Sequence, residues 1–342
     1  GVLAAFRSFR DHWAAQGRQI TLDLSIGGWT KSKHFSPCAS TDAKRTTVVD
    51  SVVALLQETN FDGVDYDWEY PECCGMSDNA YSDQDFDNYV KLLQLTRQKL
   101  DAAFPGVHKG LSIAMGMGPL VTNPAPKLAL ANTIDAVNMM TYDYSGHWDQ
   151  ITGHNAPLYC DPAKVTAGGQ PHFCIDWGVQ QWLDAGVPPS KIVLGLASYG
   201  RGWIGTTQEY GQAGGGVVGS PPYPAQVGLK SYWDIAQNFL TNPAYTRHWN
   251  DVSKVPYLTG NGEFISYDDE ESITEKVHYA KNHGFKGVMW WEASEDVDSI
   301  LLIAGNQAYG GAPSTSGGGT NPEPEQPANP EPEQPATPTR VY

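Results

Sequence analysis

Long hydrophobic runs and basic residues are both scarce in this 342-residue sequence. No apolar run approaches the ~18 residues of a membrane-spanning helix, so no membrane partner is expected. Lysine and arginine number 22 against 38 aspartates and glutamates, which gives a net charge of −16 at pH 7. Because nucleic acids attract basic surfaces, this balance disfavours a nucleic-acid partner. No signal peptide is recognisable, but the chain opens on Gly1 in a helical pattern, so its start is uninformative about secretion.

Cysteine is also sparse, with five residues in the chain. Cys160 and Cys174 bracket a Gly- and Pro-containing loop that a disulfide could close in an oxidising compartment. The adjacent Cys73 and Cys74 lack the spacing of zinc ligands, and no metal site is expected. The odd number leaves one thiol without a partner in this chain, and the pairing of Cys38, Cys73 and Cys74 stays open.

Residues 311–342 differ in composition from the rest of the chain. They are rich in Gly, Ser, Pro and Glu, and the octapeptide NPEPEQPA occurs at 321–328 and again at 329–336. This composition is typical of a disordered linker, and proline-rich chains extend at ~3.1 Å per residue. The repeats would therefore hold a neighbouring domain ~50 Å away.

Residues 1–310 alternate between short apolar runs and helical patterns, which is typical of βα units around a parallel sheet. A closed (β/α)8 TIM barrel needs eight strands. Since residues 2–17 are typical of a helix without its strand, we expect a barrel that lacks its first two strands. A small α+β insertion, about 203–270, is expected before the last strand, with a hairpin turn at 260–262. Six strands are predicted, at 20–28, 61–69, 110–118, 134–144, 191–200 and 285–294, with helices including 42–60, 83–104 and 176–187, each beginning at an Asp expected to cap it.

The predicted strand at 61–69, in the stretch FDGVDYDWEYP, carries acids where a buried strand should be apolar. Val64, Tyr66 and Trp68 form one face, and the opposite face is Asp65, Asp67 and Glu69, spaced ~6.6 Å apart. Three carboxylates in one low-dielectric column cannot all ionise without a large free-energy cost, so at least one pKa must be raised.

Three acids on one face of a predicted strand have three interpretations. A solvated edge strand is disfavoured by the apolar runs around it. A divalent-cation site is weakened because no ligand loop or phosphate-binding loop accompanies the acids. The interpretation we favour is general acid catalysis by Glu69, the longest acid and the nearest to the carboxyl end of the strand, where barrel active sites lie.

The segment DGVDYDWEYP resembles the active-site strand of glycoside hydrolase family 18, the chitinases. SIGGW at 25–29, MTYDY at 140–144, YGRGW at 199–203 and GVMWWE at 287–292 resemble further motifs of that family, in the family's order. Together these motifs cover residues 1 to about 304 and are specific, although each alone is weak. The resemblance implies a TIM barrel.

The resemblance also implies roles for individual residues. Glu69 would protonate the glycosidic oxygen, and Asp67 would orient the N-acetyl group of the sugar, whose carbonyl oxygen attacks C1. Asp65 would share a proton with Asp67, and Tyr142 would hydrogen-bond the N-acetyl oxygen. Trp291 would stack on the sugar ring, while Trp290 should point away from it. Other positions matching the family's substrate groove are Gly28, Trp29, Tyr70, Met140, Asp143, Trp148, Tyr199 and Arg201.

The resemblance thus implies a secreted, extracellular, monomeric chitinase acting on chitin or chitooligosaccharides, with no metal or organic cofactor. Two alternatives stay open: a chitin-binding lectin on the same fold, and an endo-β-N-acetylglucosaminidase acting on glycoproteins. A carbohydrate-binding module is one candidate for what the Pro/Glu linker holds. A barrel that lacks two strands would expose strand edges, so we expect the chain to be a fragment whose activity alone is uncertain.

Overall fold

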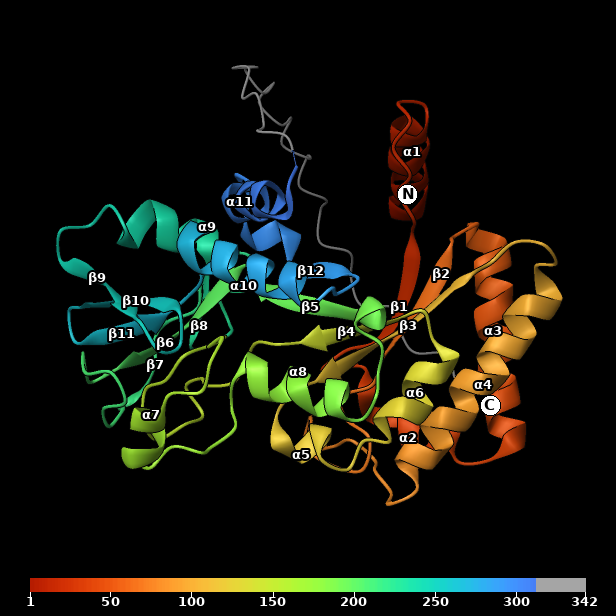
Figure 1. Cartoon of the computed structure of the whole chain (residues 1–342), viewed down its shortest axis with the longest axis horizontal. Helices are drawn as coiled ribbons and strands as arrows, with labels where there is room; N and C mark the ends of the chain where they lie inside the picture. The colour runs from red at the N-terminus through yellow and green to blue at the C-terminus, as the bar shows by residue number, and fades with distance from the viewer. Residues whose placement is uncertain (312–342) are drawn as a thin grey trace, which may run out of the picture. The chain divides into compact units, whose positions relative to one another are not determined.

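A computed structural model describes residues 1–311 as one compact unit; the linker expected at 311–342 lies, apart from Gly311, outside the described residues. Six parallel strands form the central sheet, and all six sequence-predicted strands are confirmed (Figure 1). β1 and β12 lie at the two ends of the sheet and do not pair with each other within residues 1–311. The fold is therefore of the TIM-barrel type, with six of its strands present. In spatial order they are β1 (Asp23–Gly27), β2 (Gly63–Asp67), β3 (Gly110–Gly116), β4 (Ala136–Met140), β5 (Ile192–Ala197) and β12 (Gly287–Trp291).

A second, antiparallel sheet is inserted between β5 and β12, as expected before the last strand. The predicted hairpin is present, because β10 and β11 pair across a turn in which Asn261 and Gly262 have positive φ. Figure 1 shows this sheet at one end of the unit and α3 and α4 at the other. Its strands are β6 (Tyr199–Ile204), β7 (Gly215–Gly216), β8 (Leu229–Ser231), β9 (Tyr245–Asn250), β10 (Val255–Gly260) and β11 (Glu263–Ser266).

Helices occupy most of the connections between the parallel strands. The longer ones are α1 (Val2–Ala14), α3 (Asp42–Thr59), α4 (Asp85–Ala103), α8 (Ile175–Asp184), α10 (Glu270–Asn282) and α11 (Ile300–Tyr309). The shorter ones are α2 (Phe35–Ala39), α5 (Pro119–Thr122), α6 (Lys127–Thr133), α7 (Pro162–Thr166) and α9 (Tyr232–Asp234). Single turns of 3₁₀ or π-helix are η1 (Ser32–His34), η2 (Pro189–Lys191), η3 (Ile235–Phe239) and η4 (Ala293–Glu295). Of the helices among the described residues, none is both long and apolar enough to cross a membrane.

The prediction that Asp residues cap three helices is wrong. Thr41 caps α3, with its side chain accepting from the Lys44 amide, and no side chain caps α4 or α8. Asp83 directly precedes Gln84, the N-cap residue of α4, while Asp42 and Asp176 lie in the first turns of α3 and α8, where the backbone is already helical. There a carboxylate interacts favourably with the helix dipole without supplying the cap.

The core lies between the parallel sheet and its helices. In β2, Val64 and Tyr66 are fully buried, and Trp68 directly after it is also buried, so this face of the strand anchors it. Trp68 stacks on Phe35 and meets Tyr89 edge-on, which are favoured geometries for aromatic pairs. This packing fixes the direction in which the alternate residues Asp65, Asp67 and Glu69 project.

Candidate active site

The carboxyl end of β2 brings the predicted acids to the edge where neighbouring strands also end. Asp65 pairs in register with Ser25 of β1 and Ser112 of β3. Its carboxylate accepts hydrogen bonds from both hydroxyls, at 3.2 and 2.6 Å, and from the Asn138 side-chain amide at 3.0 Å. Burial raises the pKa of Asp65, and these three hydrogen bonds oppose that shift. Asp65 is therefore held by its neighbours on β1, β3 and β4.

Asp67 has a different environment, since it is 7% exposed and its Oδ1 is buried without a hydrogen-bond partner among residues 1–311. Burial raises its pKa to about 8, and the charges of Glu69 and Asp65 act in the same direction. Gly28 lies next to this carboxyl, because a β-carbon there would be in ordinary contact with Asp67 Oδ2, at 3.7 Å. The proton shared with Asp65 stays a prediction, and a raised pKa of Asp67 is consistent with it.

Glu69 is 9% exposed, and its main chain is fixed on both sides. Its amide donates to Ser32 Oγ at 2.8 Å, and its carbonyl accepts from Asn79 Nδ2 at 2.8 Å. Burial raises the Glu69 pKa to about 7; the Tyr70 hydroxyl opposes this shift, and the charge of Asp143 adds to it. A carboxyl of this kind keeps a proton near neutral pH and is suited to general acid catalysis.

A second polar cluster follows β4 and includes five of the predicted residues. Asp143 Oδ1 accepts from the Tyr199 hydroxyl at 2.9 Å and from Arg201 Nε at 2.7 Å. The Arg201 guanidinium lies 5.0 Å from the Trp148 ring centroid, within cation–π range.

Tyr142 meets Tyr199 edge-on, with 6.1 Å between the ring centroids, and is almost fully buried. The charges of Asp143, Asp67, Glu69 and Asp65 all contribute to raising the Tyr142 pKa, after burial, so the two clusters interact electrostatically.

The predicted aromatic residues differ in exposure. Trp29, Trp148 and Trp291 are each about half exposed, at 51, 53 and 51%, which leaves part of each indole accessible to a ligand. Trp290 points the other way, as expected, since it packs against Gly305 of α11. Tyr70 packs closely on Gly116, and Met140 ends β4 half-buried against the core.

The structure adds residues that the sequence did not single out. Glu295 is 1% exposed, and burial raises its pKa to about 8, with a further contribution from the charge of Glu292. Arg201 and Asp143 also act on this pKa, which places Glu295 near the second cluster. Glu292 itself accepts from the Tyr223 hydroxyl at 2.9 Å. Tyr223 and Glu295 lie outside the recognised motifs, whereas Glu292 ends the motif GVMWWE, which by itself did not indicate this contact.

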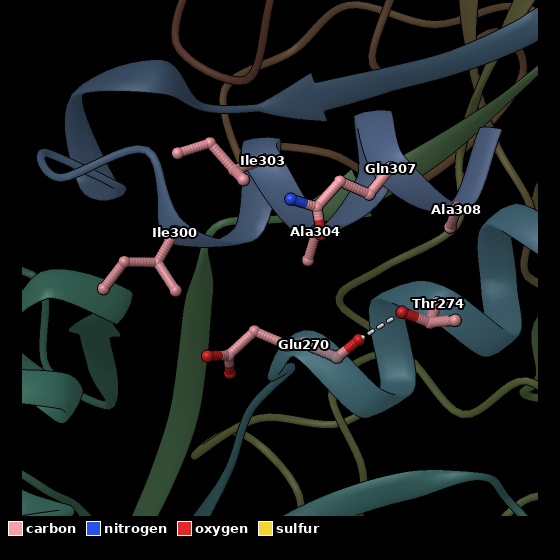
Figure 2. A pocket seen from close by; sticks show the side chains of 7 residues that line it. All are labelled: Glu270, Thr274, Ile300, Ile303, Ala304, Gln307 and Ala308. Carbon is pink, nitrogen blue, oxygen red and sulfur yellow. Dashed lines mark hydrogen bonds between the residues drawn. The ribbon is translucent and has the colours of Figure 1, made fainter. Parts of the chain in front are cut away.

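Neither a groove elsewhere on the surface nor a cluster of metal ligands among residues 1–311 competes with this edge of the sheet as the candidate site. A groove between α10 and α11 is lined by Glu270, Thr274, Ile300, Ile303, Ala304, Gln307 and Ala308, and includes none of the predicted site residues (Figure 2). Within residues 1–311 no three His, Cys, Asp or Glu side chains are grouped as metal ligands. The buried acids and half-exposed tryptophans at the carboxyl ends of the strands therefore form the candidate active site.

Comparison with known proteins gives consistent results. The sequence profile of Glycosyl hydrolases family 18 matches residues 3–296. Chitinase A1 from Niallia circulans is 43% identical over 290 residues, covering 81% of this chain and 41% of that protein. Endochitinase 1 from Metarhizium robertsii is 37% identical over 308 residues, covering 87% of this chain and 67% of that protein. The chain thus spans less than half the length of Chitinase A1.

Among solved structures, chitinase ChiA74 from Bacillus thuringiensis superposes with a TM-score of 0.83 at 32% identity, covering 92% of this chain and 53% of that one. The family profile extends over most of the residues that the structure describes, including the acid strand and the last parallel strand. The chain belongs to glycosyl hydrolases family 18.

Proposed function

We propose that the protein is a chitinase that hydrolyses β-1,4 bonds between N-acetylglucosamine units with retention of configuration. The observation that carries the proposal is the pair Asp67 and Glu69, two buried carboxyls with raised pKa values at the carboxyl end of one strand. Family membership and the chitinase names of the relatives support the same activity. No metal or organic cofactor is required for this reaction.

In this proposal Glu69 donates a proton to the glycosidic oxygen while the bond from that oxygen to C1 breaks. The N-acetyl carbonyl oxygen of the same sugar bonds to C1, and water later displaces it, so configuration is retained. Asp67 orients the N-acetyl group through its unpartnered Oδ1, and Asp65 exchanges a proton with Asp67. The Tyr142 hydroxyl hydrogen-bonds the N-acetyl oxygen and favours its attack.

The half-exposed tryptophans support a substrate made of sugar rings. Indole faces stack on the apolar faces of pyranose rings, and Trp291 lies at the end of the last parallel strand. Trp29, which follows β1, and Trp148, which follows β4, would extend such a surface. Completing the proposed groove are Gly28, Tyr70, Met140, Asp143, Tyr199 and Arg201. The presence of Glu69 favours an enzyme over a lectin, because a lectin does not need a catalytic acid.

We also propose a cellular setting and a domain organisation for the enzyme. The disulfides Cys73–Cys74 and Cys160–Cys174 are typical of an oxidising compartment, which supports secretion. We propose that residues 1–310 form a monomeric catalytic domain with its insertion at about 203–270. Residues 311–342 would then link it to a carbohydrate-binding module.

Replacing Glu69 tests the proposal directly. Glu69→Gln keeps the size of the side chain but cannot deliver a proton, so we expect kcat on an N-acetylated chitotetraose to fall by about 10²–10⁴-fold while the binding affinity changes little. Product release is measured by chromatography and binding by calorimetry. Glu58→Gln, on the exposed surface of α3, is the matched control and should retain full activity. Substantial hydrolysis by Glu69→Gln would overturn the role of Glu69.

A further inference from the structure

The turn after the acid strand contains a disulfide between two adjacent residues, Cys73 and Cys74. It begins four residues after Glu69, so it lies at the same edge of the sheet as the candidate active site. Cys73 is half-buried, and its Sγ lies 3.8 Å from the Leu120 carbonyl oxygen, in the connection that follows β3. Cys74 is exposed, so its sulfur is open to attack from solution.

The backbone of this turn adopts conformations that L-amino acids disfavour. Glu72 and Cys74 have φ of 66° and 60°, and Gly75 follows with 71°. Each non-glycine residue in this region costs about 1–2 kcal/mol, so such geometry persists only where the surroundings impose it. A bond between adjacent cysteines closes an eight-membered ring around the peptide that joins them. That ring restricts the backbone at Cys74 directly.

The same turn contacts the main chain of Glu69. Gly75 packs on the Glu69 carbonyl so closely that a β-carbon at Gly75 would lie 2.2 Å from that oxygen. Asn79, four residues later, donates its side-chain amide to the same oxygen at 2.8 Å. The position of the Glu69 carbonyl therefore depends on the conformation of residues 75–79. Ser32 fixes only the amide side of Glu69.

We propose that the Cys73–Cys74 disulfide is a positioning pair for Glu69, acting through Gly75 and Asn79, and that a dithiol reductant slows the enzyme by opening it. The proposal rests on the proposed function. One thiolate of the dithiol attacks Cys74 Sγ and breaks the S–S bond; its second thiol then displaces Cys74 from the mixed disulfide. Two electrons and two protons pass to the protein, which gains two thiols, and the reductant leaves as a disulfide. The freed turn can then leave its left-handed conformations, and the contacts with the Glu69 carbonyl loosen.

The test compares the full chain before and after reduction by dithiothreitol, with thiols counted by alkylation and mass spectrometry. We expect kcat on an N-acetylated chitooligosaccharide to fall about tenfold, because small misplacements of a catalytic group are costly. KM should change less than about twofold, since the exposed tryptophans that bind the sugar are not moved. Reoxidation should restore the rate. Hydrogen exchange of the peptide covering residues 69–79 should speed up on reduction, which gives a measurement independent of activity.

Two cysteine variants separate this disulfide from the other one. A chain carrying Cys160→Ser and Cys174→Ser retains Cys73–Cys74 and should respond to the reductant as the parent does. A chain carrying Cys73→Ser and Cys74→Ser should be slow from the start and insensitive to reductant. Asn79→Ala, with the disulfide intact, should reproduce the slow rate.

The proposal is overturned if complete conversion of Cys73 and Cys74 to thiols leaves both kcat and the exchange of residues 69–79 unchanged. If neither redox state hydrolyses the oligosaccharide, the proposed function fails, and the exchange measurement alone decides the positioning proposal. Faster exchange on reduction in the chain lacking Cys160 and Cys174 would then support it, and unchanged exchange would overturn it.

Discussion

At the scale of single residues, the proton on Glu69 is controlled by its surroundings. Burial disfavours the carboxylate, and the charge of Asp143 adds to this, which together bring the Glu69 pKa to about 7. Asp143 is itself held by Tyr199 and Arg201, so the second cluster acts on the acid although it belongs to other strands. The pH range of activity should therefore depend on both clusters.

The alkaline limb of the pH–rate profile tests this dependence. Because Glu69 must be protonated to act as an acid, kcat/KM should fall as pH rises through about 7. Asp143→Asn removes a charge that disfavours ionisation of Glu69, so the limb should move to lower pH. Asp101→Asn, on the exposed side of α4, is the control and should leave the limb in place. A limb that does not move in Asp143→Asn contradicts the electrostatic coupling.

At the scale of secondary structure, close contacts between neighbouring strands position Tyr142. Gly195 of β5 has no room for a side chain, because a β-carbon there would lie 2.3 Å from the Met139 carbonyl and 2.9 Å from Tyr142 Cε1. The Gly195 carbonyl also accepts from the Thr141 hydroxyl at 2.6 Å. The end of β4, together with Tyr142, therefore packs directly against β5.

Gly195→Ala should separate β4 from β5 and displace Tyr142. We expect a loss of about 1–3 kcal/mol in the free energy of unfolding, together with a lower kcat. Gly287→Ala is the matched control in β12, where a β-carbon meets nothing within 4 Å. Urea denaturation and steady-state kinetics of both variants measure the two effects. Equal stability of the two variants would show that close packing at Gly195 does not hold β4 against β5.

The sequence predicted the parallel strands well because each is a short apolar run bounded by Gly or an acid, a signal contained within the segment itself. Helix caps were predicted poorly, since an Asp near a helix start serves equally in the first turn, as Asp42 and Asp176 do. The active-site strand was found because its three acids are contiguous in sequence. Ser112, Asn138 and Glu295 are single polar residues on separate elements, and only the fold brings them to the site.

For the protein as a whole, three buried carboxyls lower the free energy of unfolding as pH rises towards neutral and above. The pKa values of Asp67 and Glu295 are raised to about 8 and that of Glu69 to about 7, in each case chiefly by burial. A carboxyl whose pKa is raised in the folded state binds its proton more tightly there than in the unfolded chain. Its contribution to stability is therefore complete below its unfolded pKa and is lost as pH rises towards the folded value.

The free energy of unfolding should therefore fall between about pH 4.5 and 8, and Glu295→Gln should flatten that fall. We expect this variant to match the parent near pH 4.5 and to exceed its stability by about 2 kcal/mol at pH 8, because the amide carries no charge to bury. Urea denaturation at pH 4.5, 6 and 8 measures the difference. Glu58→Gln, on the exposed surface of α3, should stay within about 0.5 kcal/mol of the parent at every pH. A stability difference in Glu295→Gln that does not grow with pH would show that Glu295 is ionised in the folded protein.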